Sequence, residues 1–210
     1  MSKDTYFVKS LEEDFATKTL KGTKKVTFQT IGNIIQTKTI KPNTTSFGRK
    51  HRLSCTIIHK NYLKTYRPQG IIFKTSQKPD YVLPFDLVLL SATNNIIVQY
   101  YRIKNSLHKY YGNALISGFE HFIFKNFSSL IRKYHSPQKV WKAVNRFRKA
   151  KGYSLLKKQK YRLVLYNEAV FHKSVHITPV AIIGYSKEAR QLAKKFHLTH
   201  YRSTKEFYKS

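Results

Sequence analysis

The clearest chemical pattern in this chain joins two acids and a lysine. Asp86 lies in the stretch 80–91 and Lys104 ends the stretch 96–104, and we expect these two stretches to pair as a hairpin through residues 92–95. A carboxylate on one strand and a lysine on its neighbour can hold Mg²⁺ and activate a water for attack on phosphorus. The next helix offers a single further acid, Glu120. The sequence therefore predicts Asp86, Lys104 and Glu120 as catalytic residues, with Asp86 and Glu120 as Mg²⁺ ligands.

This arrangement resembles in part the core of the PD-(D/E)XK nucleases. That family places Glu, Asp or Gln two residues before the lysine, where this chain has Arg102. The resemblance implies a small Mg²⁺-dependent endonuclease, with the missing acid supplied by Glu120. In the competing interpretation Asp86 ends a strand and Lys104 meets solvent or a phosphate.

A metal-free reaction is the other chemical reading. Glu168 lies near Tyr166 and His172, and general acid–base chemistry on a nucleic acid needs only such groups within hydrogen-bond reach. Base excision would use this kind of site. His197 and His200 have metal-like spacing, but no acid or thiol lies close to them in sequence, so we interpret them as a phosphate contact at a helix end. No glycine-rich nucleotide loop is present, which disfavours ATP-driven or dinucleotide chemistry.

The charge of the chain indicates a polyanionic partner. Its 210 residues contain 40 Lys and Arg against 10 Asp and Glu, and 40 − 10 gives a formal net charge of +30. Nucleic acid is the polyanion that best matches such an imbalance, and tyrosines interleaved with the charge suit stacking on unpaired bases. The candidate nucleic-acid-binding residues come from a loop near residue 50 and from a basic helix and its exit. They are Arg49, Lys50, Arg52, Lys139, Lys142, Arg146, Arg148, Lys149, Lys151, Lys157, Lys158 and Lys160.

The cysteine content and the apolar runs indicate where the protein works. Cys55 is the one cysteine, so no disulfide can form within the chain. No apolar run approaches the length of a membrane span, and the N-terminus lacks the apolar stretch of a secretory signal. We therefore expect the cytoplasm or another reducing intracellular compartment.

Hydrophobic periodicity predicts an α+β fold for residues 1–210 as one nucleic-acid-binding domain. We expect a strand-rich N-terminal half of antiparallel hairpins, two to three amphipathic helices, and further strands in the C-terminal half. The expected strands cover 25–40 with a turn at Gly32-Asn33, 53–59, 70–74, 80–91, 96–104, 161–171 and 175–183. The expected helices cover 114–134, the segment from Pro137 to Gly152 with Ser136 as its N-cap, and a segment after Ser186.

Two functions fit these observations. The first is a small DNA-acting enzyme, either a restriction-type nuclease or a base-excising enzyme. The alternative is a structural RNA-binding protein such as a ribosomal component, because extreme basicity with few acids needs no metal site. A DNA-binding regulator is a third option, although the turn at residues 134–137 matches a helix-turn-helix poorly. A twofold homodimer would suit an enzyme that acts on both strands.

Overall fold

The computed structural model of the chain describes residues 5–10, 31–42, 53–85, 87–90 and 116–210. These residues form a mostly antiparallel sheet together with separate helices, which confirms the predicted α+β class. The strands are β1 (Phe7–Ser10), β2 (Thr39–Ile40), β3 (Leu53–Ile57), β4 (Gly70–Lys74), β5 (Tyr81–Leu83), β6 (Glu168–Phe171), β7 (Val175–His176), β8 (Thr178–Ile183) and β9 (Thr199–Tyr201). The α-helices are α1 (Ile31–Thr37), α2 (Phe127–Lys133), α3 (Pro137–Ala150), α4 (Lys187–Lys195) and α5 (Thr204–Lys209).

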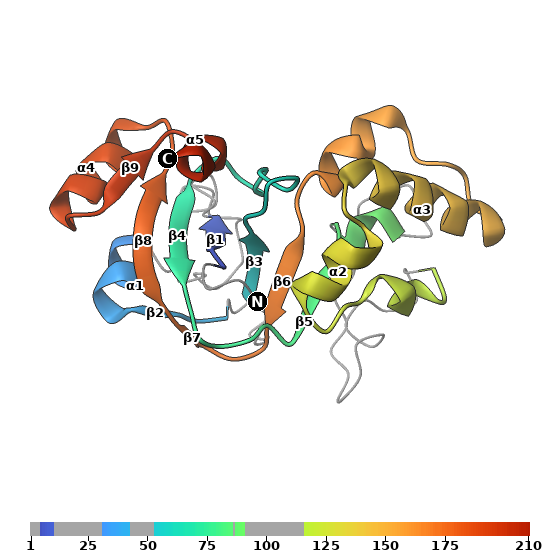
Figure 1. Cartoon of the computed structure of the whole chain (residues 1–210), viewed down its shortest axis with the longest axis horizontal. Coiled ribbons are helices and arrows are strands. Elements are labelled where there is room, and N and C mark those ends of the chain that lie inside the picture. Colours follow the sequence, from blue (N-terminus) through green and yellow to red (C-terminus); the bar gives the residue numbers. More distant parts are fainter. Residues whose placement is uncertain (1–4, 11–30, 43–52, 86, 91–115) are drawn as a thin grey trace, which may run out of the picture.

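A seven-stranded sheet forms the centre of the structure (Figure 1). Its strand order is β5-β6-β3-β1-β4-β8-β9, and β2 pairs separately with β7. Every neighbouring pair in the large sheet is antiparallel except β8 and β9, which are parallel and are connected through α4. The parallel pair follows from this connection, because a helix carries the chain back to the end of the sheet where β8 began.

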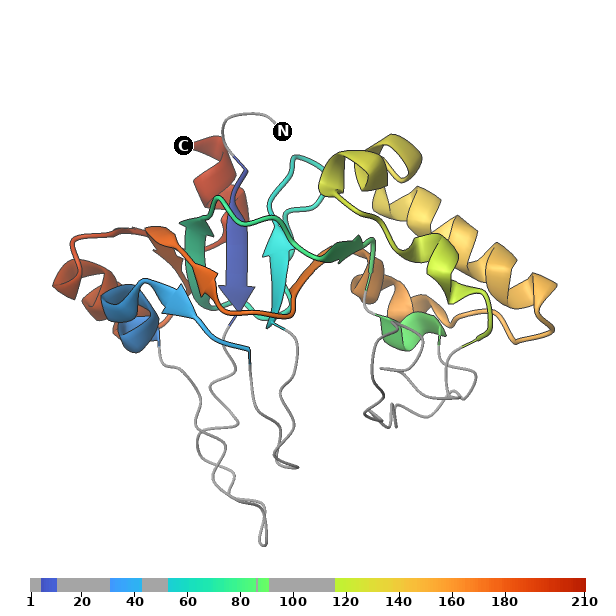
Figure 2. The same ribbon diagram turned by 90° about the horizontal axis from the view of Figure 1, so that it is seen from below.

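Residues 116–164 form a helical lobe beside the β5–β6 end of the sheet (Figures 1 and 2). The lobe contains α2, α3 and two 3-10 helices, at Phe119–Phe122 and Lys158–Val164. Phe124 and Val82 exchange backbone hydrogen bonds of 2.7 and 2.9 Å, so the lobe continues the hydrogen bonding of β5. The lobe is therefore attached to the sheet by main-chain bonds as well as by packing.

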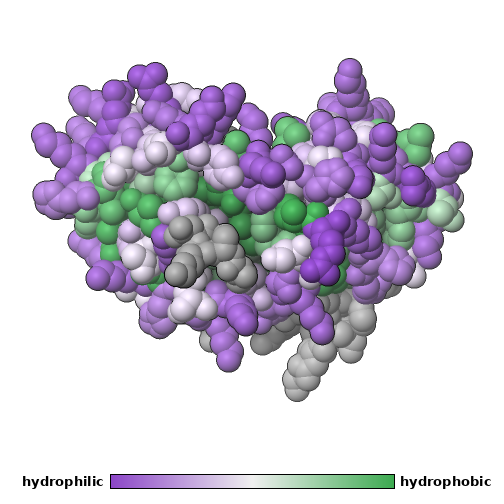
Figure 3. Space-filling view, viewed as in Figure 1, coloured by the Kyte–Doolittle hydropathy of each residue, from purple (hydrophilic) through white to green (hydrophobic). Residues whose placement is uncertain are grey.

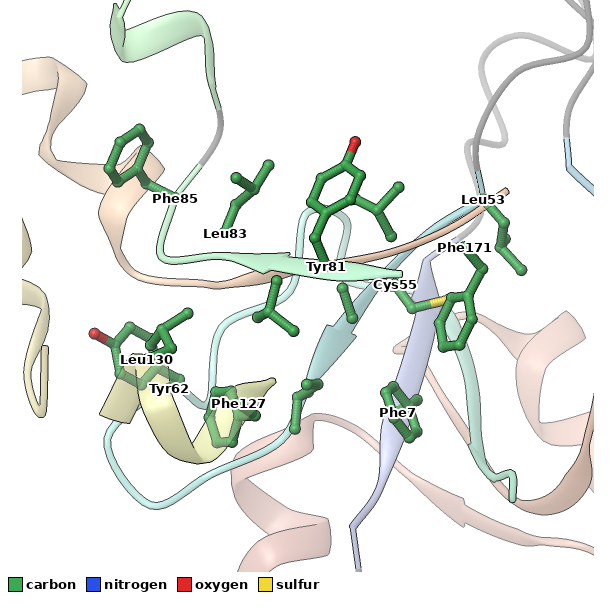
Figure 4. Close-up of a cluster of buried hydrophobic side chains, with 14 of the residues drawn as sticks. Phe7, Leu53, Cys55, Tyr62, Tyr81, Leu83, Phe85, Phe127, Leu130 and Phe171 are labelled. Carbon is green, nitrogen blue, oxygen red and sulfur yellow. The ribbon is translucent and has the colours of Figure 1, made fainter. Parts of the chain in front are cut away.

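The sheet and the helical lobe share one apolar core. Phe7, Cys55 and Phe171 from the sheet belong to the same buried cluster as Phe127 and Leu130 from α2 (Figure 4). A smaller cluster on the other face packs β1, β4 and β8 under side chains of β9 and α5. Large aromatic side chains dominate buried area, which explains why so much of the Phe and Tyr content is internal.

Two predicted strands are wrong in part. Residues 31–37 form α1 instead of the second half of a hairpin, because Ile31, Ile34 and Ile35 recur at helical spacing and two of them are fully buried. Gly32 faces Leu192 and Phe196, so α1 packs on α4. The stretch 80–91 is a strand only at β5, since Pro84 follows it and residues 87–90 form a 3-10 helix. Residues 25–30 and 91–104 lie outside the described residues.

The predicted helix at 114–134 is interrupted. Gly118 has a φ of 89° and Ile123 is extended, and these two residues separate the 3-10 helix at 119–122 from its neighbours. Asn126 then caps α2 by accepting a hydrogen bond from the Ser129 N–H, so a new helix begins there. The predicted strand at 161–171 is likewise a 3-10 helix followed by the short β6.

Three predictions are confirmed closely. β4 covers residues 70–74, α3 begins after Ser136 and ends before Gly152, and α4 begins after Ser186.

Among the described residues, no helix has the length and apolar character to cross a membrane.

Candidate nucleic-acid interface

Helix α3 has one buried face and one exposed basic face. Ser136 caps its start, accepting a hydrogen bond from the Lys139 N–H, and Gly152 with a φ of 75° follows its end. Pro137, Val140, Val144 and Arg148 are buried on one face. Four exposed cations occupy the opposite face, and we call them the α3 stripe: Lys139, Lys142, Arg146 and Lys149.

The α3 stripe concentrates positive charge. Its members follow one another at intervals of three or four residues, or about 4.5–6 Å along the helix axis. This separation is shorter than the Debye length of about 8 Å at physiological salt, so the four charges repel one another. A bound polyanion would relieve that repulsion.

Glu120 is the one acid of the helical lobe, and the rest of the lobe has none. Between Glu120 and Glu168 the sequence contains no aspartate or glutamate. The same 47 positions, 121–167, hold thirteen cations: Lys125, Arg132, Lys133, Lys139, Lys142, Arg146, Arg148, Lys149, Lys151, Lys157, Lys158, Lys160 and Arg162. Hydrophilic side chains cover much of the lobe on the right of the space-filling view (Figure 3). This acid-free interval is a stronger electrostatic feature than a basic helix with i,i+4 ion pairs.

Arg148 differs from the other predicted binding residues. It is 2% exposed, and its guanidinium donates hydrogen bonds to the carbonyls of Ser154 (2.8 Å) and Leu89 (3.1 Å). Burial lowers the pKa of its guanidinium below the ordinary value. Arg148 lies four residues after Val144 on the apolar face, a spacing that would have placed it inside from the sequence. Its role in this structure is to hold the chain after α3 against the 87–90 turn.

The segment after α3 places further cations beside the helix. The Asn145 side-chain carbonyl accepts a hydrogen bond from the Leu156 N–H at 2.8 Å, and the Trp141 ring contacts Tyr161 at 5.4 Å. Lys157 and Lys158 are exposed there, and Lys160 is half-buried. Lys151 is exposed, and its ammonium lies beside Gly118, away from the α3 stripe.

The predicted catalytic trio is only partly placed. Glu120 is exposed on the 3-10 helix at the start of the helical lobe. Asp86 and Lys104 lie outside the described residues, as do Arg49, Lys50 and Arg52 of the first basic cluster. Within the part of the chain that the structure describes, no three His, Cys, Asp or Glu residues gather in a way that could hold a metal ion.

The acids of the sheet have polar partners. Glu168 on β6 accepts a hydrogen bond from the Ser54 hydroxyl across the β3–β6 pair. Asp80 accepts one from the His172 N–H at 2.7 Å, and its carboxylate lies 3.4 Å from Nδ1 of the same histidine. Glu168 and His172 thus each have a polar partner: Ser54 for Glu168 and Asp80 for His172.

The two histidines at the end of α4 lie in different surroundings. His197 is exposed and adopts a φ of 53°, where it ends the helix. The Nε2 atom of His200 lies 2.8 Å from the Gly184 carbonyl oxygen, so this ring supports the junction between β8 and β9.

The exposed cations of the helical lobe can contact successive phosphates of a nucleic acid. The sequence signal for the complete surface, including Lys125, Arg132 and Lys133, is the long interval without an acid from residue 121 to 167.

A scan against protein-family models and searches of curated proteins and of solved structures found no match to this chain.

Proposed function

We propose that this protein binds nucleic acid through its helical lobe, with the α3 stripe contacting the phosphate backbone. The observation that supports this function is the acid-free interval 121–167, which forms most of the helical lobe. Four of its cations, the α3 stripe, are exposed on the side of α3 that faces away from the core. Protein cations that neutralise phosphates release condensed counterions, which makes the affinity depend steeply on salt.

The test compares two sets of four cations on different helices. One variant replaces the α3 stripe by glutamine: Lys139→Gln, Lys142→Gln, Arg146→Gln and Lys149→Gln. The matched control removes the same charge from exposed positions of α4: Lys187→Gln, Arg190→Gln, Lys194→Gln and Lys195→Gln. Fluorescence anisotropy with labelled oligonucleotides then gives the affinity of each protein between 50 and 200 mM salt.

The expected change follows from counterion release. Four lost phosphate contacts reduce the slope of log K against log[salt] by about 3.6 on duplex DNA, or by about 2.8 on a single strand. The α4 variant should change the slope by less than half as much. Equal losses in the two variants, or unchanged binding in the α3 variant, would contradict the proposed interface.

The enzymatic hypothesis is tested on the same material. We propose it in the form that the sequence motivates, with Asp86, Lys104 and Glu120 acting on DNA. Plasmid is incubated with Mg²⁺ or with EDTA and then heated with alkali. Nicking that needs Mg²⁺ and is lost in Asp86→Asn supports a nuclease, breaks that appear only after alkali support base excision, and intact plasmid in every condition contradicts both.

A further inference from the structure

The connection between α2 and α3 is a short, supported turn. Only three residues, Tyr134, His135 and Ser136, separate the seven-residue α2 from the fourteen-residue α3. The two helices are inclined to each other, and α3 lies on the outer side of the lobe (Figures 1 and 2). Two inclined helices joined by a turn of three or four residues form the helix-turn-helix arrangement. Residues 134–137 match the sequence pattern of this motif poorly, whereas the length of the connection between α2 and α3 agrees with it.

Side chains from the loop after β3 form hydrogen bonds with the turn. The Tyr62 hydroxyl donates a hydrogen bond to the Tyr134 carbonyl at 2.9 Å, and this tyrosine is fully buried. The Asn61 side-chain amide donates to the His135 carbonyl at 2.7 Å. These bonds orient the start of α3 relative to the sheet, so the helix is presented as a rigid element.

The outward face of α3 has the dimensions and chemistry of a groove-reading helix. Its fourteen residues extend about 21 Å, and an α-helix with side chains is about 10–12 Å across, which the major groove of B-DNA admits. Exposed Gln138 begins this face, followed by the α3 stripe, and Gln, Lys and Arg are side chains that bond base edges in that groove. The small side chains Ala143 and Ala150 border the stripe, so the helix can approach closely.

Neighbouring cations lie where a helix in the groove needs them. Arg132 is exposed at the end of α2, the helix that crosses the backbone in this arrangement. Lys157 and Lys158 are exposed on the segment that packs along the other side of α3. Phosphates border the major groove on both sides, so cations beside both edges of α3 match a duplex better than a single strand.

We infer that the ligand of the helical lobe is double-stranded DNA, with α3 lying in its major groove. This inference rests on the proposed nucleic-acid binding and names the class of ligand. A-form RNA offers a deep, narrow major groove that side chains cannot read, so the same surface should discriminate against duplex RNA. Single strands lack a groove altogether.

The experiment measures three ligands of one sequence by anisotropy: a 20-base-pair DNA duplex, the corresponding RNA duplex and the single DNA strand. We expect the DNA duplex to bind at least ten times more tightly than the other two, and methyl green, which occupies the major groove, to displace the protein where the minor-groove ligand netropsin does not. The variant with the α3 stripe replaced by glutamine should lose this preference, whereas the α4 variant should keep it.

The possible failures are distinguishable. Equal or tighter binding of duplex RNA or of the single strand would overturn the inference and leave the proposed nucleic-acid binding intact. Displacement by netropsin in place of methyl green would overturn the groove assignment. Absence of binding to all three ligands would overturn the proposed function and this inference together.

Discussion

Two arginines two positions apart in α3 offer a direct test of the two faces of that helix. Arg146 is exposed on the α3 stripe, whereas Arg148 is buried and donates to two backbone carbonyls. Arg146→Met and Arg148→Met each remove one positive charge and insert the same side chain two positions apart. The structure predicts that one substitution weakens binding and the other weakens folding.

The magnitudes follow from the contacts. Arg148→Met leaves the buried Leu89 carbonyl without this donor, which costs about 1–3 kcal/mol. It also removes the part-buried bond to the Ser154 carbonyl, and a hydrogen bond from a charged donor contributes about 1.5–3 kcal/mol. Methionine fills much of the vacated apolar volume and needs no desolvation of a charge, which offsets part of this loss. We expect a net decrease of about 2–4 kcal/mol in the free energy of unfolding. Arg146→Met should change it by less than about 0.5 kcal/mol, as usual for an exposed position.

Urea denaturation and salt-dependent binding together provide the assay. Trp141 is the single tryptophan, it is half-buried on α3, and its ring contacts Tyr161, so its fluorescence reports the unfolding of the helical lobe. In the absence of urea, Arg146→Met should reduce the salt slope of duplex binding by about 1. Arg148→Met should leave that slope unchanged.

One pattern of results would refute this reasoning. If Arg148→Met unfolded at the urea concentration of the unmodified protein and also lost the salt slope of one phosphate contact, its guanidinium would be a ligand contact. The buried position in the structure would then be wrong.

Three further predictions concern the sheet. Burial raises the pKa of the Cys55 thiol to about 12 from an ordinary 9.0, so a thiol reagent at pH 8 should not label Cys55 until urea unfolds the chain. The contribution of this thiol to stability is present below pH 9 and decreases between pH 9 and 12. Rapid labelling without urea would contradict this. Asn167 exchanges two hydrogen bonds with the backbone of Ile57, so Asn167→Ala should lower the free energy of unfolding by about 2–4 kcal/mol. The urea midpoint should fall accordingly, and an unchanged midpoint would refute this role. A Cβ at Gly70 would lie 2.4 Å from the Lys9 carbonyl oxygen, so Gly70→Ala should separate β1 from β4 and lower the thermal midpoint, and a wild-type midpoint would count against this β1–β4 pairing.

The sequence predicted the elements whose local signals agree with their packing. For α3, an N-cap serine, a proline at the first position and a glycine after the end coincide with an apolar stripe at helical spacing. For β4, a short run of β-branched residues is buried on both faces of the sheet. In each case the local preference and the tertiary environment favour the same structure.

The errors occurred where a short segment satisfies two patterns. Gly32-Asn33 resembles a hairpin turn, but the isoleucines around it serve equally as the buried face of α1, and packing on α4 favours the helix. β9 and α5 were not predicted, because a three-residue strand and a six-residue helix contain too few residues to show periodicity.

The candidate site was predictable in composition but not in arrangement. Charge and the acid-free interval point to the helical lobe, and they say nothing of which cations face outward. Arg148 belongs to the apolar face because Val140 and Val144 precede it at intervals of four. The turn between α2 and α3 accepts hydrogen bonds from Tyr62 and Asn61, which lie more than seventy positions away in the sequence.

The bonds from Tyr62 and Asn61 to the α2–α3 turn also have a thermodynamic consequence. They link the α2–α3 turn to the loop between β3 and β4, so hydrogen bonds connect the helical lobe to the centre of the sheet. A ligand held at one hundred times its dissociation constant adds about 2.7 kcal/mol to the stability of the state that binds it. Amide protons of β1 and β3, distant from any phosphate, should therefore exchange more slowly when the duplex is bound.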